Sequence, residues 1–155
     1  MTNLVPLEIV QYCAEEVERQ RDTPVAVGRM CEAWMWAVER WFHGKGDALE
    51  YLRPPRGVET IVRIGAMVHP ANVHGFRKVP VLAGGNPCPE PVLVPRMVEN
   101  LVEAFSTLSP EDAYREYQQI HPFVDGNGRS GKIIFNWLKG TLMSPVMPPN
   151  FFNVP

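Results

Sequence analysis

The sequence is poor in cysteine and has no excess of positive charge, and both facts narrow the range of functions. Three of the 155 residues are cysteines, Cys13, Cys31 and Cys88, and none belongs to a C-x-x-C pair. We therefore expect neither a disulfide framework nor a zinc ribbon, but buried or inert thiols in a reducing cytosol. Lysine and arginine number 15 against 17 aspartates and glutamates, a net charge of -2 without a basic stripe. Nucleic acid is therefore not an expected partner.

Long apolar runs are missing as well. No stretch approaches the roughly 20 apolar residues that a membrane-spanning helix needs. The opening segment, MTNLVPLEIVQYCAEEVERQ, turns acidic where a signal peptide would carry an apolar core. We predict a cytoplasmic protein without a membrane partner. Delivery into a host cytosol by a dedicated secretion system would leave the same pattern.

Helical periodicity dominates the rest of the chain. A composition of 45% hydrophobic and 21% charged residues suits one compact domain over residues 1–155. Apolar residues recur at the spacing of one helical face in several segments, so we predict a mainly α fold, a helical bundle. The predicted helices cover residues 7–21, 25–42, 47–52, 58–68, 95–108, 110–121 and 130–139.

One segment departs from helical periodicity. Phe76–Leu82 reads as an extended strand that runs into a turn at Ala83–Asn86. Pro80 cannot donate a ladder hydrogen bond, which favours an exposed hairpin over a central strand. We therefore add one small β-hairpin to the bundle. The proline-rich tail, residues 144–155, is expected to be irregular.

The loop between the last two predicted helices carries a group of residues suited to binding an anion. Gly126, Asn127 and Gly128 tolerate positive φ, so their N–H groups could converge in a nest at the start of the next helix. A helix N-terminus favours negative charge. Arg129 and Lys132 add positive charge on the same side, and together these groups predict a phosphate site.

Three other residues of this loop have chemistry of their own. Asp125 precedes the nest, where a carboxylate could hold Mg²⁺ against the same phosphates. His121 lies at the other end, where a neutral imidazole could take a proton from an incoming hydroxyl. Phe123 is apolar in a polar loop, and we expect it to anchor the loop in the core.

The stretch His121-Pro-Phe-Val-Asp-Gly-Asn-Gly-Arg129 resembles the signature of the Fic family, H-x-F-x-[D/E]-G-N-G-R-x-x-R. Upstream, Gly75-Phe-Arg-Lys-Val-Pro-Val81 is similar to the flap of that family. The likeness covers roughly residues 57–140, and residues 1–56 carry no separate motif. It implies a Fic-like helical bundle with a small β-hairpin flap, and an enzyme that transfers AMP from Mg-ATP to a Ser, Thr or Tyr hydroxyl of a target protein.

The resemblance also implies roles for individual residues. His121 would be the general base, Asp125 the magnesium ligand, and Arg129 the group that neutralises charge as pyrophosphate leaves. Asn127 and the amides of Gly126–Gly128 would hold the phosphates. The flap would pair with an extended piece of the target, a form of strand addition. Its residues are Arg77, Lys78, Val79, Pro80 and Val81.

The sequence departs from the family pattern in two places. Lys132 replaces the final arginine, which in the family helps to hold the distal phosphates and pairs with a glutamate of an inhibitory helix. Lysine keeps the charge but loses the two-pronged guanidinium, so we expect a weaker phosphate contact. The inhibitory motif, [S/T]-x-x-x-E-[G/N], has no credible copy, since Thr107 to Glu111 is followed by Asp112. Either a separate antitoxin-like partner inhibits the enzyme, or it is a toxin-like protein without a gate.

Other functions remain open. Fic-like proteins that phosphorylate, or that transfer UMP or phosphocholine, are the nearest alternatives, because Lys132 leaves donor handling unsettled. A non-catalytic module that binds nucleotide or peptide is an alternative of another class. A metal-binding protein built on His43, His69, His74 and the cysteines is less well supported, since the spacing fits a zinc knuckle poorly.

Overall fold

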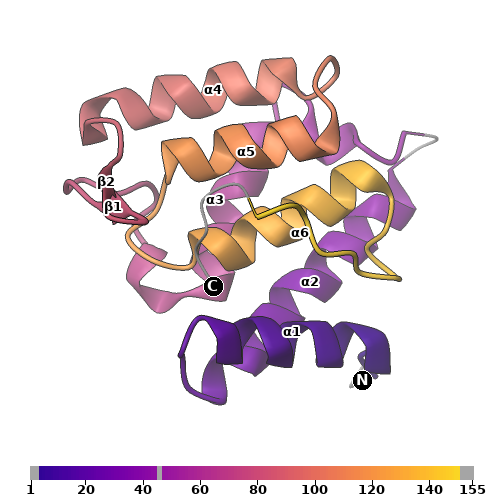
Figure 1. Ribbon diagram of the computed structural model, residues 1–155. Coiled ribbons are helices and arrows are strands. Elements are labelled where there is room, and N and C mark those ends of the chain that lie inside the picture. The colour runs from indigo at the N-terminus through magenta and orange to yellow at the C-terminus, as the bar shows by residue number, and fades with distance from the viewer. Residues whose placement is uncertain (1–3, 45–46, 151–155) are drawn as a thin grey trace.

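Six α-helices follow one another in the computed structural model, which describes residues 4–44 and 47–150 (Figure 1). The mainly α class predicted from periodicity is confirmed. Short 3-10 turns lie at Glu50–Leu52, Pro70–Asn72 and Pro91–Leu93. The helices are α1 (Leu7–Arg19), α2 (Val25–His43), α3 (Gly57–Val68), α4 (Val94–Ala104), α5 (Pro110–Ile120) and α6 (Asn127–Lys139).

Helix α6 lies at the centre of the bundle. Every residue from Arg129 to Trp137 is buried, and the helix packs against α5, α2 and α3 (Figure 1). The indole N–H of Trp137 donates to the carbonyl of Ala48 at 2.8 Å, so even this large side chain leaves no polar atom without a partner. Helix α6 is therefore held in place by three neighbouring helices.

The N-terminal helices complete the core from the other side. Helix α1 packs on α2, and α2 packs on both α3 and α6. Cys13 and Cys31 are buried as free thiols between them, and Cys88 is half-buried. Among the described residues, no helix combines the length and the apolar character needed to cross a membrane.

The hairpin is shorter than the sequence suggested. The strands are only β1 (Leu82–Ala83) and β2 (Asn86–Pro87), paired antiparallel with Ala83 opposite Asn86. The predicted strand from Phe76 to Leu82 is therefore wrong over its first six residues. Pro80 has no N–H to donate, and the N–H of Arg77 bonds the carbonyl of Pro122, at 2.9 Å, instead of a neighbouring strand. Gly84 and Gly85 form the turn with positive φ, as two-residue hairpins require.

Two helix ends bear directly on the site. Helix α6 begins at Asn127, three residues before the predicted start, because Gly126 takes a left-handed conformation and serves as its N-cap. Helix α5 ends at Ile120, followed by His121 as a left-handed C-cap. Beyond α6, residues 144–150 form no helix or strand, as predicted, and residues 151–155 of the tail lie outside the described part.

Candidate functional site

His121 is presented by an unusual backbone conformation at the end of α5. Its φ of 50° and ψ of 65° lie in the left-handed region, which residues other than glycine rarely adopt. The N–H of His121 still bonds the carbonyl of Tyr117 at 3.0 Å. The chain therefore turns sharply at this residue, and the imidazole projects from the helix end while the loop leads away.

The imidazole environment favours the neutral form. Burial is the main cause that lowers the pKa of His121 below its ordinary value, and the nearby charge of Arg77 lowers it further. The main-chain carbonyl of Gln118 and the carboxylate of Asp125 act in the opposite direction. Among the described residues, Nδ1 of His121 is buried without a hydrogen-bond partner. A neutral imidazole that lines a pocket can accept a proton from a bound hydroxyl, as a general base does.

The loop after His121 is braced by its own side chains. Oδ1 of Asn127 accepts the N–H of Phe123 at 2.8 Å, and its Nδ2 donates to the carbonyl of the same residue at 2.9 Å. Nδ2 of Asn72 donates to the carbonyl of Asp125 at 2.7 Å. The Phe123 ring is fully buried against the ring of Phe76, at a centroid distance of 5.6 Å. The structure thus puts Phe123 in the core, and it puts the Asn127 side chain against the loop.

The predicted glycine nest takes a different form. Only Gly126 has a positive φ, whereas Asn127 and Gly128 are the first residues of α6. The N–H of Gly126 donates to Oδ1 of Asp125 at 2.7 Å. Ser130 is the first residue of α6 whose N–H bonds a main-chain carbonyl, that of Gly126 at 2.9 Å, and no side chain caps the helix. The free amides of the first turn of α6 could therefore bind an anion, in place of a separate nest.

Both cations of the motif are paired with carboxylates from the N-terminal part of the chain, one on α1 and one in the connection between α1 and α2. Nζ of Lys132 lies 2.7 Å from Oε1 of Glu16, and a guanidinium nitrogen of Arg129 lies 2.7 Å from Oδ2 of Asp22. Arg129 also lies 3.5 Å from Asp125. Lys132 and Arg129 are buried, so neither projects freely into solvent. An incoming phosphate would have to share Lys132 with Glu16.

Glu16 contacts a motif residue, Lys132, and motif reasoning did not find it. It is 1% exposed, and it also accepts hydrogen bonds from Arg19 at 2.7 Å and Gln20 at 3.0 Å. One signal was present in the sequence: a glutamate stands seven residues after Ile9, on the apolar face of α1. Burial lowers the pKa of Lys132, and the charge of Glu16 opposes this shift. The ion pair therefore offsets part of the cost of burying the ammonium.

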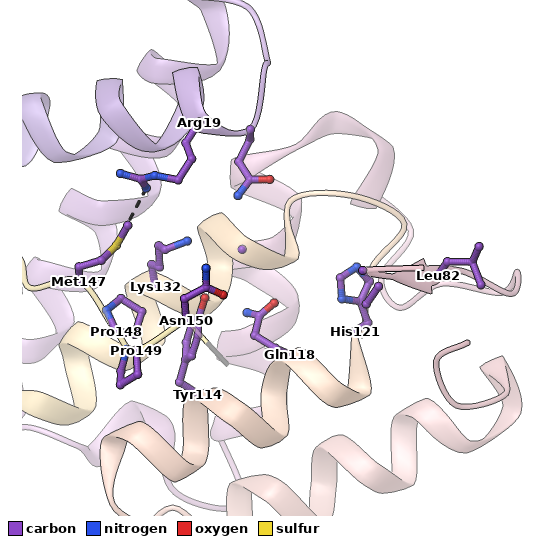
Figure 2. A pocket seen from close by; sticks show the side chains of 14 residues that line it. Arg19, Leu82, Tyr114, Gln118, His121, Lys132, Met147, Pro148, Pro149 and Asn150 are labelled. Atoms are coloured by element: carbon purple, nitrogen blue, oxygen red, sulfur yellow. Dashed lines mark hydrogen bonds between the residues drawn. The ribbon is translucent and has the colours of Figure 1, made fainter. Parts of the chain in front are cut away.

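A pocket of about 480 Å³ opens beside these groups (Figure 2). His121 lies at one end, near Leu82 of the hairpin, and Met147, Pro148 and Pro149 of the tail lie at the opposite end. Three of the predicted site residues line it. The lining comprises Arg19, Gln20, Leu82, Ala83, Gly84, Tyr114, Gln118, His121, Gly128, Lys132 and Met147–Asn150.

The remaining loop residues lie around the pocket rather than in its lining. The side chain of Asp125 is 60% exposed, and its Oδ2 lies 3.5 Å from Nε2 of His69. Nδ1 of His69 accepts the N–H of Ala71 at 3.0 Å, so the proton of a neutral His69 lies on Nε2 and faces the carboxylate. Asp125 is thus held at one oxygen by Gly126 and approached at the other by His69.

The predicted flap divides into an inward and an outward part. Arg77 is 2% exposed, and its side chain points into the protein, away from any target. Lys78, Val79 and Pro80 are exposed, and Val81 is half-buried. The hairpin residues that follow, Leu82–Gly84, border the pocket. The segment that could meet an extended peptide therefore starts after Arg77.

The site as a whole combines an imidazole of lowered pKa, free helix amides and a buried lysine around one pocket. Such a combination can bind the phosphates of a donor and accept a proton from a hydroxyl. A comparison with protein-family models identifies the family. The model described as the Fic/DOC family matches residues 55–138, more than half of the chain, and the protein belongs to this family of transferase-type enzymes.

Proposed function

We propose that the protein transfers AMP from Mg-ATP to a Ser, Thr or Tyr hydroxyl of another protein, with His121 as general base. One observation carries the proposal. The imidazole, whose pKa is lowered, lies at the end of a pocket that is also lined by Gly128 in the first turn of α6 and by Lys132. Base and phosphate site thus face the same volume.

The shape of the pocket supports a nucleotide as donor. Its volume of about 480 Å³ is within the usual range for small-molecule sites. The phosphates would lie at the N-terminus of α6 and near Lys132. The apolar end, lined by Tyr114, Met147 and Pro148, would receive the nucleobase. This orientation leaves the hairpin end open to the acceptor hydroxyl.

The residues near Asp125 fit a magnesium ion that reaches the site with the donor. No three His, Cys, Asp or Glu side chains in the described ranges come together as a metal centre of their own. Mg²⁺ is commonly bound by one or two carboxylates plus substrate phosphates. Asp125 offers an exposed carboxylate, and the bound ion would supply neutralisation of phosphate charge.

The transfer step then needs little covalent help from the protein. The acceptor oxygen attacks the α-phosphorus, a new phosphorus–oxygen bond forms, and the bond to the bridging oxygen breaks to release pyrophosphate. His121 receives the hydroxyl proton. Because an imidazole cannot deprotonate an alcohol in advance, proton transfer accompanies bond formation. The amides of α6, with Lys132 and Arg129, balance the charge on the phosphates.

Glu16 adds a regulatory element to the proposal. Its carboxylate lies 2.7 Å from the ammonium of Lys132, the group that would contact a distal phosphate. Helix α1 therefore competes with the donor from within the same chain. The sequence around it, Tyr12-Cys-Ala-Glu-Glu16-Val17, lacks the Ser/Thr and Gly/Asn of the inhibitory motif. A separate inhibitor could act in addition, by holding α1 in place.

Mass spectrometry of a lysate incubated with the protein and ATP tests the function. We expect target peptides that are heavier by AMP, and no such peptides with His121→Ala. Calorimetry should show that His121→Ala still binds Mg-ATP. A mass increase of phosphate, UMP or phosphocholine would replace AMP transfer by the corresponding reaction. ATP binding without any modification, in lysate or by self-labelling, would contradict an enzymatic role.

A further inference from the structure

The guanidinium of Arg77 is enclosed by main-chain oxygens, one of which belongs to His121. Arg77 is 2% exposed, and four carbonyls accept hydrogen bonds from it. Its Nε donates to the carbonyl of His121 at 2.6 Å. Its two terminal nitrogens donate to Ile120 at 3.1 Å, Pro89 at 2.6 Å and Val79 at 3.1 Å. The side chain thus joins three segments of the chain at one point.

Two of these acceptors belong to the end of α5. The last carbonyls of a helix have no partner within the helix, and a positive charge near them is favourable. Arg77 supplies both the donors and the charge, to Ile120 and His121. Its main-chain N–H also donates to the carbonyl of Pro122 at 2.9 Å. Three consecutive carbonyls, those of residues 120, 121 and 122, are therefore bonded to one residue.

This capping accounts for the left-handed conformation of His121. At such a C-cap the usual residue is glycine, because a Cβ is unfavourable there. The φ of 50° therefore needs outside support, and the hydrogen bond from Nε of Arg77 to the His121 carbonyl fixes the orientation of that peptide group. A different peptide orientation would aim the imidazole away from the pocket.

We propose that Arg77 is a positioning residue for the transfer reaction, which holds the main chain of His121 so that the imidazole points into the pocket. The inference rests on the proposed function, because it gives His121 the role of base. Arg77 itself touches neither donor nor acceptor. A lysine could keep the charge, but a single ammonium cannot reach carbonyls in four directions with the fixed geometry of a guanidinium.

The charge of Arg77 gives the proposal a second, independent readout. Within the described part of the chain no carboxylate forms an ion pair with Arg77, so its field reaches the imidazole without a bonded counter-charge. After burial, Arg77 is the main cause that lowers the pKa of His121. The Gln118 carbonyl and the carboxylate of Asp125 oppose it. Loss of the guanidinium should therefore raise the pKa of His121.

Steady-state kinetics with three variants tests the catalytic part. Arg77→Met should lower kcat roughly 10- to 100-fold, the usual effect of a misplaced catalytic group, and leave KM for ATP within about twofold. Arg77→Lys should fall between Arg77→Met and the wild type. Arg96→Met is the matched control, because Arg96 is an exposed arginine of α4 with a side chain that is 78% exposed. It should behave as the wild type does.

An NMR titration of the histidine side chains tests the structural part without substrate, with His121→Ala to assign the resonance. Folded Arg77→Met should show a shifted His121 resonance and a higher pKa, and Arg77→Lys a pKa closer to the wild type. If the wild type proved inactive, the proposed function would fail while this titration still decided the role of Arg77.

Three outcomes would overturn the proposal. The first is folded Arg77→Met with wild-type kcat and His121 titration. The second is Arg77→Lys with both wild-type properties when Arg77→Met does not fold. The third is unfolding of both variants, which would make Arg77 a residue of the fold and not of the base.

Discussion

The ammonium of Lys132 lies 2.7 Å from the carboxylate of Glu16, although 116 positions separate the two residues in the chain. Their side chains are 8% and 1% exposed. A buried ion pair is tolerated only when its geometry is good and further hydrogen bonds are made. Arg19 and Gln20 provide those bonds to Glu16. The N-terminal helix therefore supplies the anion that neutralises the lysine of the motif.

Glu16→Gln should bind ATP more tightly. Removal of the carboxylate frees Lys132 for a phosphate, and we expect an affinity gain of about tenfold, ~1.4 kcal/mol. The amide oxygen can still accept from Lys132, but the buried ammonium loses its counter-charge, so the free energy of unfolding should fall by about 3–5 kcal/mol. Calorimetry in the His121→Ala background measures the first effect and urea unfolding the second. Glu15→Gln, at an exposed position of α1, is the control; equal affinities for the two variants would refute competition by Glu16.

Gly65→Ala should displace the catalytic loop. A Cβ at Gly65 would overlap the ring of Phe123, which anchors the loop in the core. Forced overpacking of this kind lowers the free energy of unfolding by about 1–3 kcal/mol, and transfer activity should fall with it. Gly28→Ala is the control, since a Cβ there meets no atom within 4 Å. Alanine in place of a helical glycine should raise the free energy of unfolding by about 0.5–1 kcal/mol. Thermal unfolding measures the stability of both variants, and a transfer assay measures their activity. If Gly65→Ala had the stability and activity of the wild type, the ring of Phe123 would be able to move aside.

Asn127→Ala should act through the loop and not through the donor. The Asn127 side chain makes both of its hydrogen bonds to the main chain of Phe123. Their loss should lower the free energy of unfolding by about 1–3 kcal/mol. We expect a lower kcat with little change in the affinity for ATP. Asn127→Asp keeps the acceptor and loses the donor, so it should be intermediate. A large loss of ATP affinity with unchanged stability would support a direct phosphate contact instead.

As the pH is lowered, transfer activity should be lost only below the ordinary pKa of histidine. Because burial and Arg77 lower the pKa of His121, the base stays neutral below the unperturbed value of about 6.5. The acidic limb of kcat/KM against pH should have its midpoint under that value. A midpoint above about 6.5 would argue against His121 as the base.

The same shift links stability to pH. Unfolded His121 binds a proton at a higher pH than folded His121 does. The contribution of the neutral imidazole to the free energy of unfolding is therefore complete above about pH 6.5. It is lost as the pH falls from there through the lower pKa of the folded state. Urea unfolding measures the free energy of unfolding of the wild type and of His121→Asn between about pH 5 and 8. The value for the wild type should fall relative to that of the variant as the pH is lowered. A pH-independent difference would mean that His121 titrates alike in both states.

Much of the helical framework was predictable because its signals are local. The buried faces of α1, α2 and α3 are predictable, because their apolar residues recur at the spacing of one side of a helix. The start of α5 follows from Ser109, whose side chain accepts the N–H of Asp112 at 3.1 Å as an N-cap does. The predicted strand failed because propensity does not show which partner a backbone N–H will find. At Arg77 that partner is Pro122, far along the chain.

The sequence by itself determined the order of the helices and the succession of base, carboxylate, glycine and arginine within one loop, since adjacency along the chain fixes these relations. Only the tertiary structure decided which carboxylates meet Lys132 and Arg129, and that Arg77 turns inward to the end of α5. Those contacts join residues dozens of positions apart. Their energy depends on burial and on mutual orientation, and the packing of α1, α5 and α6 sets both.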